Sequence, residues 1–232
     1  YQMLRNSGYS DDDIILIMAD DLAQNAKNPE KGVVRRSVDG DNLYKNVVVD
    51  YRLDDITYND LAVIFSGKPD VAHPEVLDSG AGDNVLFFWS SHGMPAGLAL
   101  GDIDLVSGKQ MARILQKMSD EQRFRKMMWI VEACFSGGVA KECEGIPGLL
   151  VMTAANANES SKADLWYAPY NVYLTNRFTS SIISRLYSDP ATSLRDLYNV
   201  AFTGTLGSHV TIYNADNYGN LYQNTMREFL GK

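Results

Sequence analysis

A histidine and a cysteine, His92 and Cys134, each stand just beyond a short apolar run. The two stretches are "NVLFFWSSHGMPAG" (84–97) and "MMWIVEACFSGGVA" (127–140). A thiol beside an imidazole loses its proton readily and becomes a nucleophile, so these residue types can carry out acyl transfer. In such a pair His92 would be the base and Cys134 the nucleophile.

Small residues follow both side chains. Gly93 comes after the histidine, and Ser136, Gly137 and Gly138 follow the cysteine, so the backbone at both places can approach a substrate closely. The N–H groups of Gly93 and Cys134 could bind an oxyanion, which is worth roughly 3 kcal/mol per donor. A lone histidine or cysteine at a strand end is more often structural. The joint occurrence of the two motifs favours catalysis.

The remaining histidines and the second cysteine lack such neighbours. His73 precedes a proline in a polar stretch, which predicts a surface position. His209 opens an apolar run, so we expect it to cap or pack. Cys143 lies beside "KECEG" and is predicted to be a loop thiol. With only two cysteines, a disulfide framework is excluded.

Apolar runs of strand length alternate with helical patterns along the chain. Such runs are typical of strands covered on both faces, and we expect them at residues 14–18, 85–89, 128–131, 149–153 and 210–213. Apolar residues at helical spacing predict helices at 58–65, 108–118, 170–187, 193–203 and 222–230. The opening residues read as the end of a helix that runs through Gly8 into the first strand. Residues 28–51, with a possible hairpin, and 67–83 are predicted loops.

This alternation predicts an α/β fold with a mostly parallel sheet between two layers of helices. Residues 1–232 then form one domain, because no convincing linker or repeat interrupts them. Ligand chemistry in open parallel sheets gathers beyond the carboxyl ends of the strands. His92 and Cys134 both follow predicted strands, so we expect them at the same edge of the sheet.

Composition excludes several functional classes. The chain has 232 residues, 45% of them hydrophobic, which is enough for a real core. The formal net charge of −8 argues against a nucleic-acid partner. No apolar run approaches the roughly 20 residues that a membrane span needs. The acidic run at 11–13 is read as a solvated turn, so we expect no metal and no other cofactor.

The ordered motifs "SSHG", "EACFSGG" and "TAANANESS" resemble the legumain family of cysteine endopeptidases, which have a caspase-like fold. The resemblance extends through "DDDIILIMADDLAQNAKNPEKGVV", "VVVDYRLDDIT" and "SHVTIYN", and so covers most of the chain. It implies a caspase-like three-layer αβα sandwich. It also implies His92 as catalytic base, Cys134 as nucleophile, and the amides of Gly93 and Cys134 as the oxyanion hole.

The same resemblance implies cleavage after asparagine and, less readily, after aspartate. Glu132 and Ser160 match positions of the family's specificity pocket, and Ser161 lies beside them. A pocket that hydrogen-bonds an amide rejects apolar side chains, because its own polar groups would stay unpaired. In "YLTNRF", Asn176 stands where the family usually places an aspartate, which weakens the argument for strict asparagine preference.

Glu132 also has a structural alternative. A carboxylate at a strand end can form a salt bridge, and Arg123 and Arg125 lie nearby in the sequence. In the pocket, the Glu132 carboxylate would instead face the substrate.

The implied reaction passes through a thioester that water resolves. An amine in place of water would make the site a transamidase or peptide ligase. Clostripain-like and metacaspase-like relatives would instead cleave after a basic residue, and a pseudoprotease would bind without reacting. An unrelated thiol hydrolase is disfavoured because no nucleophile-elbow pattern surrounds the cysteine.

The resemblance also implies a family strand and loop upstream of the first residue. Without that strand the sheet would expose an apolar edge, so we expect an N-terminal fragment of the same precursor to complete the fold. Peptides or proteins are the expected substrates. By analogy with the family, we expect a secretory or extracytoplasmic location, such as a lysosome-like or vacuole-like compartment or the bacterial periplasm or exterior.

Overall fold

A four-stranded sheet forms the centre of the molecule in the computed structural model, which describes residues 1–102 and 104–231. Its spatial order is β11–β8–β7–β3, with bounds Thr211–Tyr213, Leu149–Thr153, Lys126–Glu132 and Asn84–Ser90. Strands β3, β7 and β8 are parallel, and only β11 runs antiparallel to its neighbour. The prediction of a mostly parallel sheet is confirmed.

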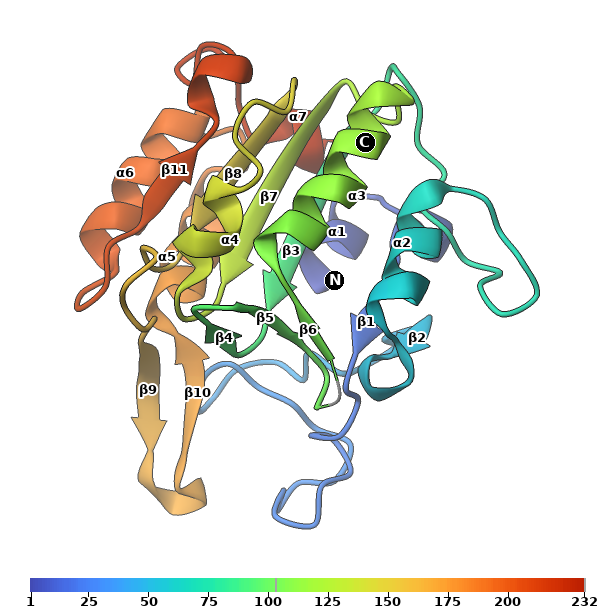
Figure 1. Ribbon diagram of the computed structural model, residues 1–232. Helices are drawn as coiled ribbons and strands as arrows, with labels where there is room; N and C mark the ends of the chain where they lie inside the picture. The colour runs from blue at the N-terminus through green and yellow to red at the C-terminus, as the bar shows by residue number, and fades with distance from the viewer. Residues whose placement is uncertain (103, 232) are drawn as a thin grey trace.

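Helices cover both faces of this sheet (Figure 1). One face carries α2, α3 and α4, which span Tyr58–Ser66, Gly108–Asp120 and Ser136–Lys141. The other face carries α1, α5, α6 and α7, which span Gln2–Asn6, Arg177–Ser188, Leu194–Gly204 and Arg227–Leu230. The arrangement is the predicted three-layer αβα sandwich.

The sequence of β7 does not alternate between polar and apolar residues, because both faces of the strand are buried. Met127, Trp129 and Val131 enter the core beneath α2–α4, whereas Met128 and Ile130 enter the core on the opposite face. All five are at most 3% exposed. Full burial of such a side chain contributes roughly 1.5–3 kcal/mol, so both faces fix the position of the strand.

Helix starts are set by local capping. Ser107 accepts a hydrogen bond from the N–H of Gln110 at the start of α3, and the Gln110 side chain bonds back to Ser107. Ser193 caps α6 through the N–H of Asp196. Each cap stabilises its helix by about 1 kcal/mol, and the two caps fix the residues at which α3 and α6 begin.

Three small sheets flank the central one. Strands β1 and β2 pair in parallel at Ile17–Met18 and Tyr51–Arg52. Strands β4, β5 and β6 form an antiparallel sheet at Gly93–Met94, Gly97–Leu100 and Asp104–Val106. Strands β9 and β10 form a hairpin at Ala163–Tyr167 and Val172–Asn176. Short 3₁₀ helices occupy 11–13, 53–55, 168–170 and 215–217.

Several predicted elements differ in extent. The predicted strand 14–18 is reduced to β1. The predicted helix 170–187 is wrong in its first part, because residues 172–176 pair with β9 and α5 begins only at Arg177. Asn171, with φ of 54°, makes the left-handed turn that allows this pairing. The predicted helix 222–230 is limited to α7.

The loop predictions at 28–51 and 67–83 fit the structure, apart from Tyr51 in β2. No hairpin is described within 28–50. Over residues 1–102 and 104–231, no helix combines the length and apolar character needed to cross a bilayer.

Candidate active site

The register of β3 and β7 sets the positions of His92 and Cys134. Ser90, the last residue of β3, lies opposite Glu132, the last residue of β7. The N–H of Ser91 extends the ladder by donating to the carbonyl of Glu132 at 3.1 Å. His92 and Cys134 each follow these paired strand ends by two residues, so both leave the sheet at the same edge.

Beyond the strands, the two turns touch through their backbones. An ideal Cβ built on Gly93 would lie 1.8 Å from the carbonyl oxygen of Cys134 and 3.1 Å from the Ala133 Cβ. Only a residue without a side chain fits at position 93. The carbonyl of His92 accepts a hydrogen bond from the N–H of Ala99 at 2.9 Å, which ties the histidine turn to β5. The His92 side chain itself is exposed.

A short hydrogen-bond chain holds the histidine turn. The Trp89 indole donates to the Ser91 hydroxyl at 2.7 Å, and that hydroxyl donates to the carbonyl of His92 at 2.9 Å. Trp89 is 7% exposed and belongs to the core, so the chain links the turn to rigid structure. The backbone of His92 is therefore fixed while its ring faces solvent.

Cys134 is half-buried at the tight turn between β7 and α4. Phe135, the next residue, has φ of 55°, a conformation that non-glycine residues rarely adopt. The carbonyl of Glu159 accepts the N–H of Phe135 at 2.8 Å and holds this turn. The Cys134 Sγ lies 3.8 Å from the Ser161 Oγ. The thiol therefore sits where the end of β7 meets the segment before β9.

Glu132 is a buried carboxyl group beside this turn, at 2% exposure. Its Oε2 accepts hydrogen bonds from the N–H and the hydroxyl of Thr179, at 3.1 and 2.9 Å. Its Oε1 has no hydrogen-bond partner among the described residues. Burial raises the pKa of Glu132. The hydrogen bonds from Thr179 and the proximity of the Ser161 hydroxyl, which is not within hydrogen-bonding geometry, offset only part of that effect. A buried oxygen without a partner can accept a donor from a ligand.

The structural alternative for Glu132, a salt bridge to Arg123 or Arg125, does not form. Arg123 donates instead to backbone carbonyls of the 66–79 segment. Arg125 bonds to Asn84 and pairs with Glu228 at 3.7 Å. Both guanidinium groups lie near the start of β7, whereas Glu132 ends it.

The other predicted pocket residues lie on the segments that lead into and out of the β9–β10 hairpin. Ser160 is exposed, and Ser161 is half-buried beside Cys134. Asn176 ends β10, opposite Ala163, and directly precedes the helix that carries Thr179. The hairpin thus connects the Ser161 segment to the helix that binds Glu132.

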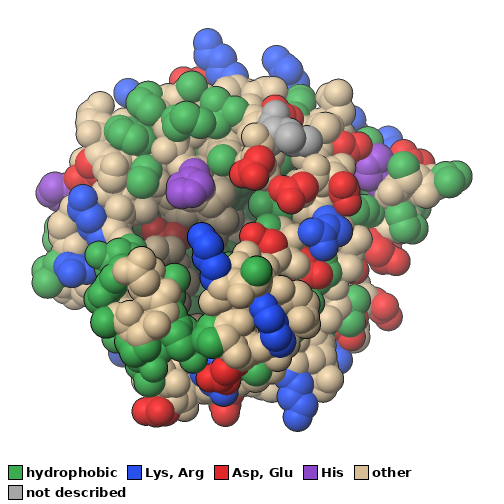
Figure 2. Space-filling model, turned by 90° about the horizontal axis from the view of Figure 1, so that it is seen from below, with side chains coloured by type: hydrophobic (Ala, Val, Ile, Leu, Met, Phe, Trp, Pro, Cys, Tyr) green, Lys and Arg blue, Asp and Glu red, His purple; other side chains and the backbone are tan. Residues whose placement is uncertain are grey.

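The face beyond the carboxyl ends of the strands is hollowed. Figure 2 shows this hollow with a histidine side chain at its rim, acidic side chains inside it and a cluster of hydrophobic side chains along one side. Exposed apolar side chains of the β9–β10 hairpin include Trp166 and Tyr173. Their rings pack edge to face with the ring centroids 4.9 Å apart.

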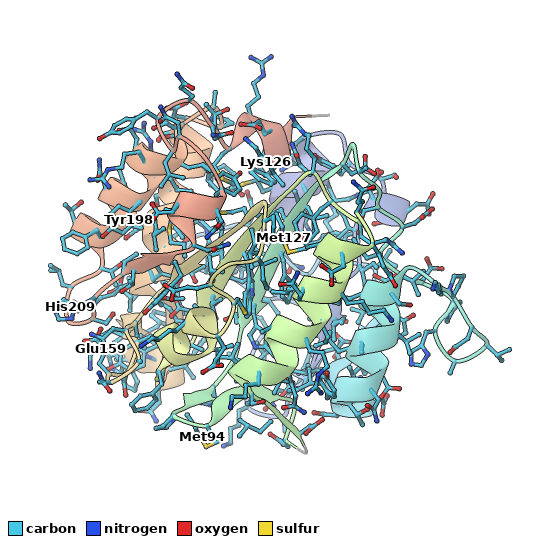
Figure 3. All side chains as sticks on the ribbon, turned by 45° about the horizontal axis from the view of Figure 1, so that its top comes forward. Met94, Lys126, Met127, Glu159, Tyr198 and His209 are labelled. Atoms are coloured by element: carbon cyan, nitrogen blue, oxygen red, sulfur yellow. The ribbon has the colours of Figure 1, made fainter. Side chains whose placement is uncertain are left out.

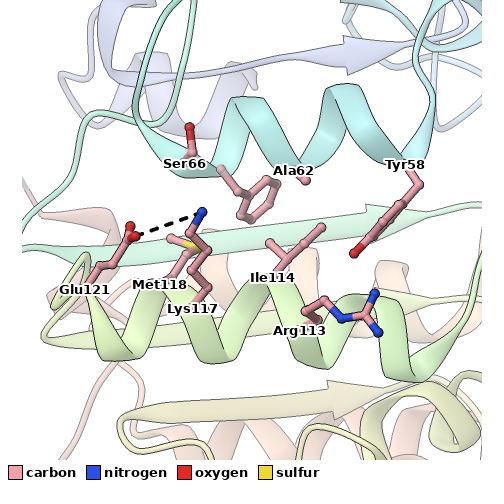
Figure 4. Close-up of a pocket in the computed structure, with 9 residues that line it drawn as sticks. Tyr58, Ala62, Ser66, Arg113, Ile114, Lys117, Met118 and Glu121 are labelled. Atoms are coloured by element: carbon pink, nitrogen blue, oxygen red, sulfur yellow. Dashed lines mark ion pairs between the residues drawn. The ribbon is translucent and has the colours of Figure 1, made fainter.

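A second hollow lies away from this site. A cavity of about 200 Å³ separates α2 from α3 (Figure 4). Its walls include Phe65, Ile114 and Met118, and Lys117 pairs with Glu121 at its rim. None of the predicted site residues lines it. A shallower groove runs between α5 and α6 and is lined largely by serines.

The surface prediction for His73 is wrong, whereas the loop position predicted for Cys143 is confirmed. His73 is not on the surface: it is 8% exposed, and its ring nitrogens each lie 2.9 Å from a carboxylate oxygen, of Asp60 and of Asp70. Cys143 follows α4 in a turn, but it is fully buried and its thiol contacts the carbonyl of Val139 at 3.7 Å. Burial raises the pKa of Cys143 to about 12, so this thiol is unreactive.

Glu159 is a residue that sequence reasoning did not assign, although it lies in the quoted motif "TAANANESS". Its carboxylate accepts the N–H of Asn156 at 3.0 Å and the N–H of His209 at 2.7 Å. The His209 Nδ1 lies 2.8 Å from the same carboxylate. The expected packing role of His209 is therefore an interaction with this loop.

Among the described residues, no group of three or more His, Cys, Asp or Glu side chains could hold a metal.

Comparisons with known proteins identify the family. Residues 1–231 match the family model of the Peptidase C13 family. The chain is 34% identical over 168 residues to the vacuolar-processing enzyme delta-isozyme of Arabidopsis thaliana, covering 69% of this chain and 35% of that protein. It is 31% identical to the vacuolar-processing enzyme of Citrus sinensis, covering 86% and 41%, and 29% identical to the legumain of Rattus norvegicus, covering 98% and 52%.

The chain thus spans between about a third and about half of the length of these relatives. Both kinds of name, legumain and vacuolar-processing enzyme, occur among the relatives, as the motif resemblance predicts. The chain belongs to the Peptidase C13 family, that of the legumains.

Proposed function

We propose that this chain is the peptidase domain of a cysteine endopeptidase that cleaves after asparagine and, less readily, after aspartate. The observation that carries the proposal is the contact between the two turns that hold His92 and Cys134. Family membership adds support, because the Peptidase C13 model covers residues 1–231.

The proposed reaction is acyl transfer to sulfur. The Cys134 thiolate, formed with His92 as base, attacks the carbonyl carbon of the scissile peptide bond. The N–H groups of Gly93 and Cys134 stabilise the resulting oxyanion. His92 then gives its proton to the leaving nitrogen, the C–N bond breaks, and a thioester remains on Cys134. Water, deprotonated by His92, hydrolyses the thioester and releases the acid.

Specificity in this proposal comes from the groups around the buried end of β7. The free Oε1 of Glu132 accepts the N–H₂ of a substrate asparagine, and Ser160, Ser161 and Asn176 supply further polar contacts. An apolar substrate side chain would leave the Glu132 oxygen unpaired. Aspartate is accepted less readily because its charge faces the carboxyl group of Glu132.

The unpaired edge of β3 could bind an additional strand. In the described part of the chain β3 pairs only with β7, and Phe88 on it is 47% exposed. A seven-residue edge with apolar side chains is a template for strand addition. We propose that an N-terminal fragment of the same precursor pairs here, and that the protein works in a vacuole-like or other extracytoplasmic compartment.

Matched peptides test the function. We would assay purified protein, with any copurifying fragment identified by intact mass, on peptides that differ only in Asn, Asp, Lys or Arg before the scissile bond. Cleavage after Asn that is lost in Cys134→Ala and strongly reduced in His92→Ala is the expected result. Cleavage after Lys or Arg would indicate a clostripain-like or metacaspase-like pocket instead.

An added amine nucleophile separates hydrolysis from ligation. Transfer of the acyl group to the amine as the main product would indicate a transamidase. A protein with its full complement of fragments that neither cleaves nor ligates any of the peptides would be a pseudoprotease, and the proposal would be wrong.

A further inference from the structure

Glu159 joins three segments that are far apart in the sequence. Its Oε1 accepts the N–H groups of Asn156 and His209, and its Oε2 lies 2.8 Å from the His209 Nδ1. Its main-chain carbonyl accepts the N–H of Phe135. The labels of Glu159 and His209 stand together at one edge of Figure 3, which agrees with these distances. One residue thus binds its own loop, the approach to β11 and the turn after Cys134.

The turn after Cys134 depends on such support. Phe135 has a positive φ of 55°, and an unfavourable backbone conformation persists only when its surroundings hold it. The loop that contains Glu159 supplies several of these contacts. Besides the bond to Phe135, the carbonyl of Ala155 accepts the N–H of Gly137 at 3.0 Å and the hydroxyl of Ser136 at 3.2 Å.

The same loop reaches the thiol. Ser161 lies two residues after Glu159, and its hydroxyl is 3.8 Å from the Cys134 Sγ. A displacement of Glu159 would therefore move Phe135 on one side of the thiol and Ser161 on the other.

We propose that Glu159, with His209 as its partner, is a positioning residue for Cys134 and for the adjoining Ser160–Ser161 segment. The inference rests on the proposed function, because it takes Cys134 as the nucleophile. Glu159 does not itself touch the reacting atoms: it acts through the Phe135 turn and through its own loop.

The charge state of Glu159 suits this role. Its side chain is 22% exposed. Burial alone would raise the pKa of Glu159, but the hydrogen bonds from Asn156 and His209, together with the nearby His209 ring, hold it below the ordinary value. The carboxylate therefore stays available as an acceptor in mildly acidic solution. Its titratable neighbour is His209, whose side chain is 71% exposed.

Three substitutions test the proposal, with kcat, KM and the rate of Cys134 alkylation by iodoacetamide as readouts. Glu159→Ala removes all three side-chain bonds, and we expect kcat to fall roughly 10- to 100-fold and alkylation to slow, because a small misplacement of the nucleophile is costly. Glu159→Gln keeps one acceptor oxygen for the N–H groups of Asn156 and His209, and should restore most of kcat. His209→Ala leaves both N–H bonds in place and should lower kcat only a few-fold.

A matched control removes another glutamate. Glu144 is exposed and lies in the turn after α4, so Glu144→Ala changes the net charge equally and should leave kcat and alkylation unchanged. Melting temperatures report folding for every variant. If Glu159→Ala does not fold, the few-fold loss of kcat expected for His209→Ala becomes the test.

The inference is overturned if well-folded Glu159→Ala keeps the wild-type kcat and alkylation rate, or, where that variant does not fold, if His209→Ala keeps both. Cys134→Ala distinguishes this failure from failure of the proposed function. If Cys134→Ala is inactive while the Glu159 variants are normal, only the positioning role is wrong. If Cys134→Ala retains activity, the proposed function itself is wrong.

Discussion

Gly93 lies so close to Cys134 that the main-chain carbonyl of Cys134 leaves no room for a side chain at position 93. A Cβ atom at position 93 would stand 1.8 Å from the Cys134 carbonyl oxygen, far inside van der Waals contact. The obstacle is backbone at the end of a buried strand, which cannot rotate away as a flexible side chain can. The glycine after the histidine is therefore a requirement of packing between the two turns.

Gly93→Ala should separate the turns. We expect the variant to lose about 1–3 kcal/mol of stability through overpacking. We also expect kcat/KM to fall at least roughly tenfold, because His92 and Gly93 would move away from Cys134. Urea unfolding and peptide hydrolysis measure the two effects.

Gly138→Ala is the matched control for this substitution. Gly138 lies in α4, and its added Cβ would meet the Ala157 Cβ at 3.7 Å, an ordinary contact. Alanine also favours a helix over glycine by up to about 1 kcal/mol. Equal losses in the two variants would contradict the close approach at position 93.

The two thiols should differ in reactivity. Cys134 is half-buried, whereas Cys143 is fully buried and its pKa is raised to about 12 by burial. Brief treatment of the native protein with iodoacetamide at neutral pH should add one carbamidomethyl group, and none in Cys134→Ala. Intact mass spectrometry counts the groups, and unfolding in urea should expose the second thiol. A native adduct on Cys143 would contradict its burial.

Much of the fold follows from sequence because its strongest signals are local. The continuous apolar runs of β7 and β8 are buried on both faces of the sheet, and the Ser107 and Ser193 caps mark helix starts. The strand at 172–176 was missed because its residues also fit a helical period. Pairing with β9, a tertiary contact, decided the outcome.

The candidate site also has parts that local sequence patterns predict and parts that they do not. The positions of His92 and Cys134 follow from two strands of equal register, which a sequence can reveal. The link between Glu159 and His209 joins residues 50 positions apart, and no local pattern encodes it. The polar stretch around His73 predicts a surface position, yet Asp70 of that stretch and the more distant Asp60 on α2 are what allow His73 to be buried.

His73 should make stability depend on pH. Burial lowers the pKa of this histidine, but the hydrogen bonds that its ring donates to Asp70 and Asp60 outweigh burial and raise the pKa above the ordinary value of 6.5. A group whose pKa is raised by folding stabilises the fold fully below its unfolded pKa. That stabilisation is lost as pH rises through the folded value. His73→Gln should therefore lower the melting temperature more at pH 5.5 than at pH 8.5.

His92→Gln is the matched control, since it makes the same substitution at an exposed histidine. Thermal unfolding followed by circular dichroism at the two pH values measures both variants. An equal effect of His73→Gln at both pH values would mean that the charged ring is not what binds the two aspartates.

The ionisation of Glu132 should destabilise the folded protein, whereas ionisation of a carboxylate with a lowered pKa stabilises it. Burial raises its folded pKa above the ordinary value, despite the bonds from Thr179. Folding therefore favours the protonated form, and the contribution to stability is lost as pH rises through the folded pKa. Glu132→Gln cannot ionise and can still accept from Thr179 through its amide oxygen. The melting temperature of the variant relative to wild type should rise between pH 4.5 and pH 7.5.

The same substitution should separate stability from specificity. The amide nitrogen of Glu132→Gln would replace the free carboxylate oxygen, so the substitution should raise KM for the Asn peptide even as the melting temperature relative to wild type rises toward neutral pH. Glu144→Gln, an exposed change, controls for net charge. If Glu132→Gln leaves KM for Asn and the Asn-to-Asp preference unchanged, Glu132 does not contact the substrate, and its burial serves only the link to Thr179 on α5.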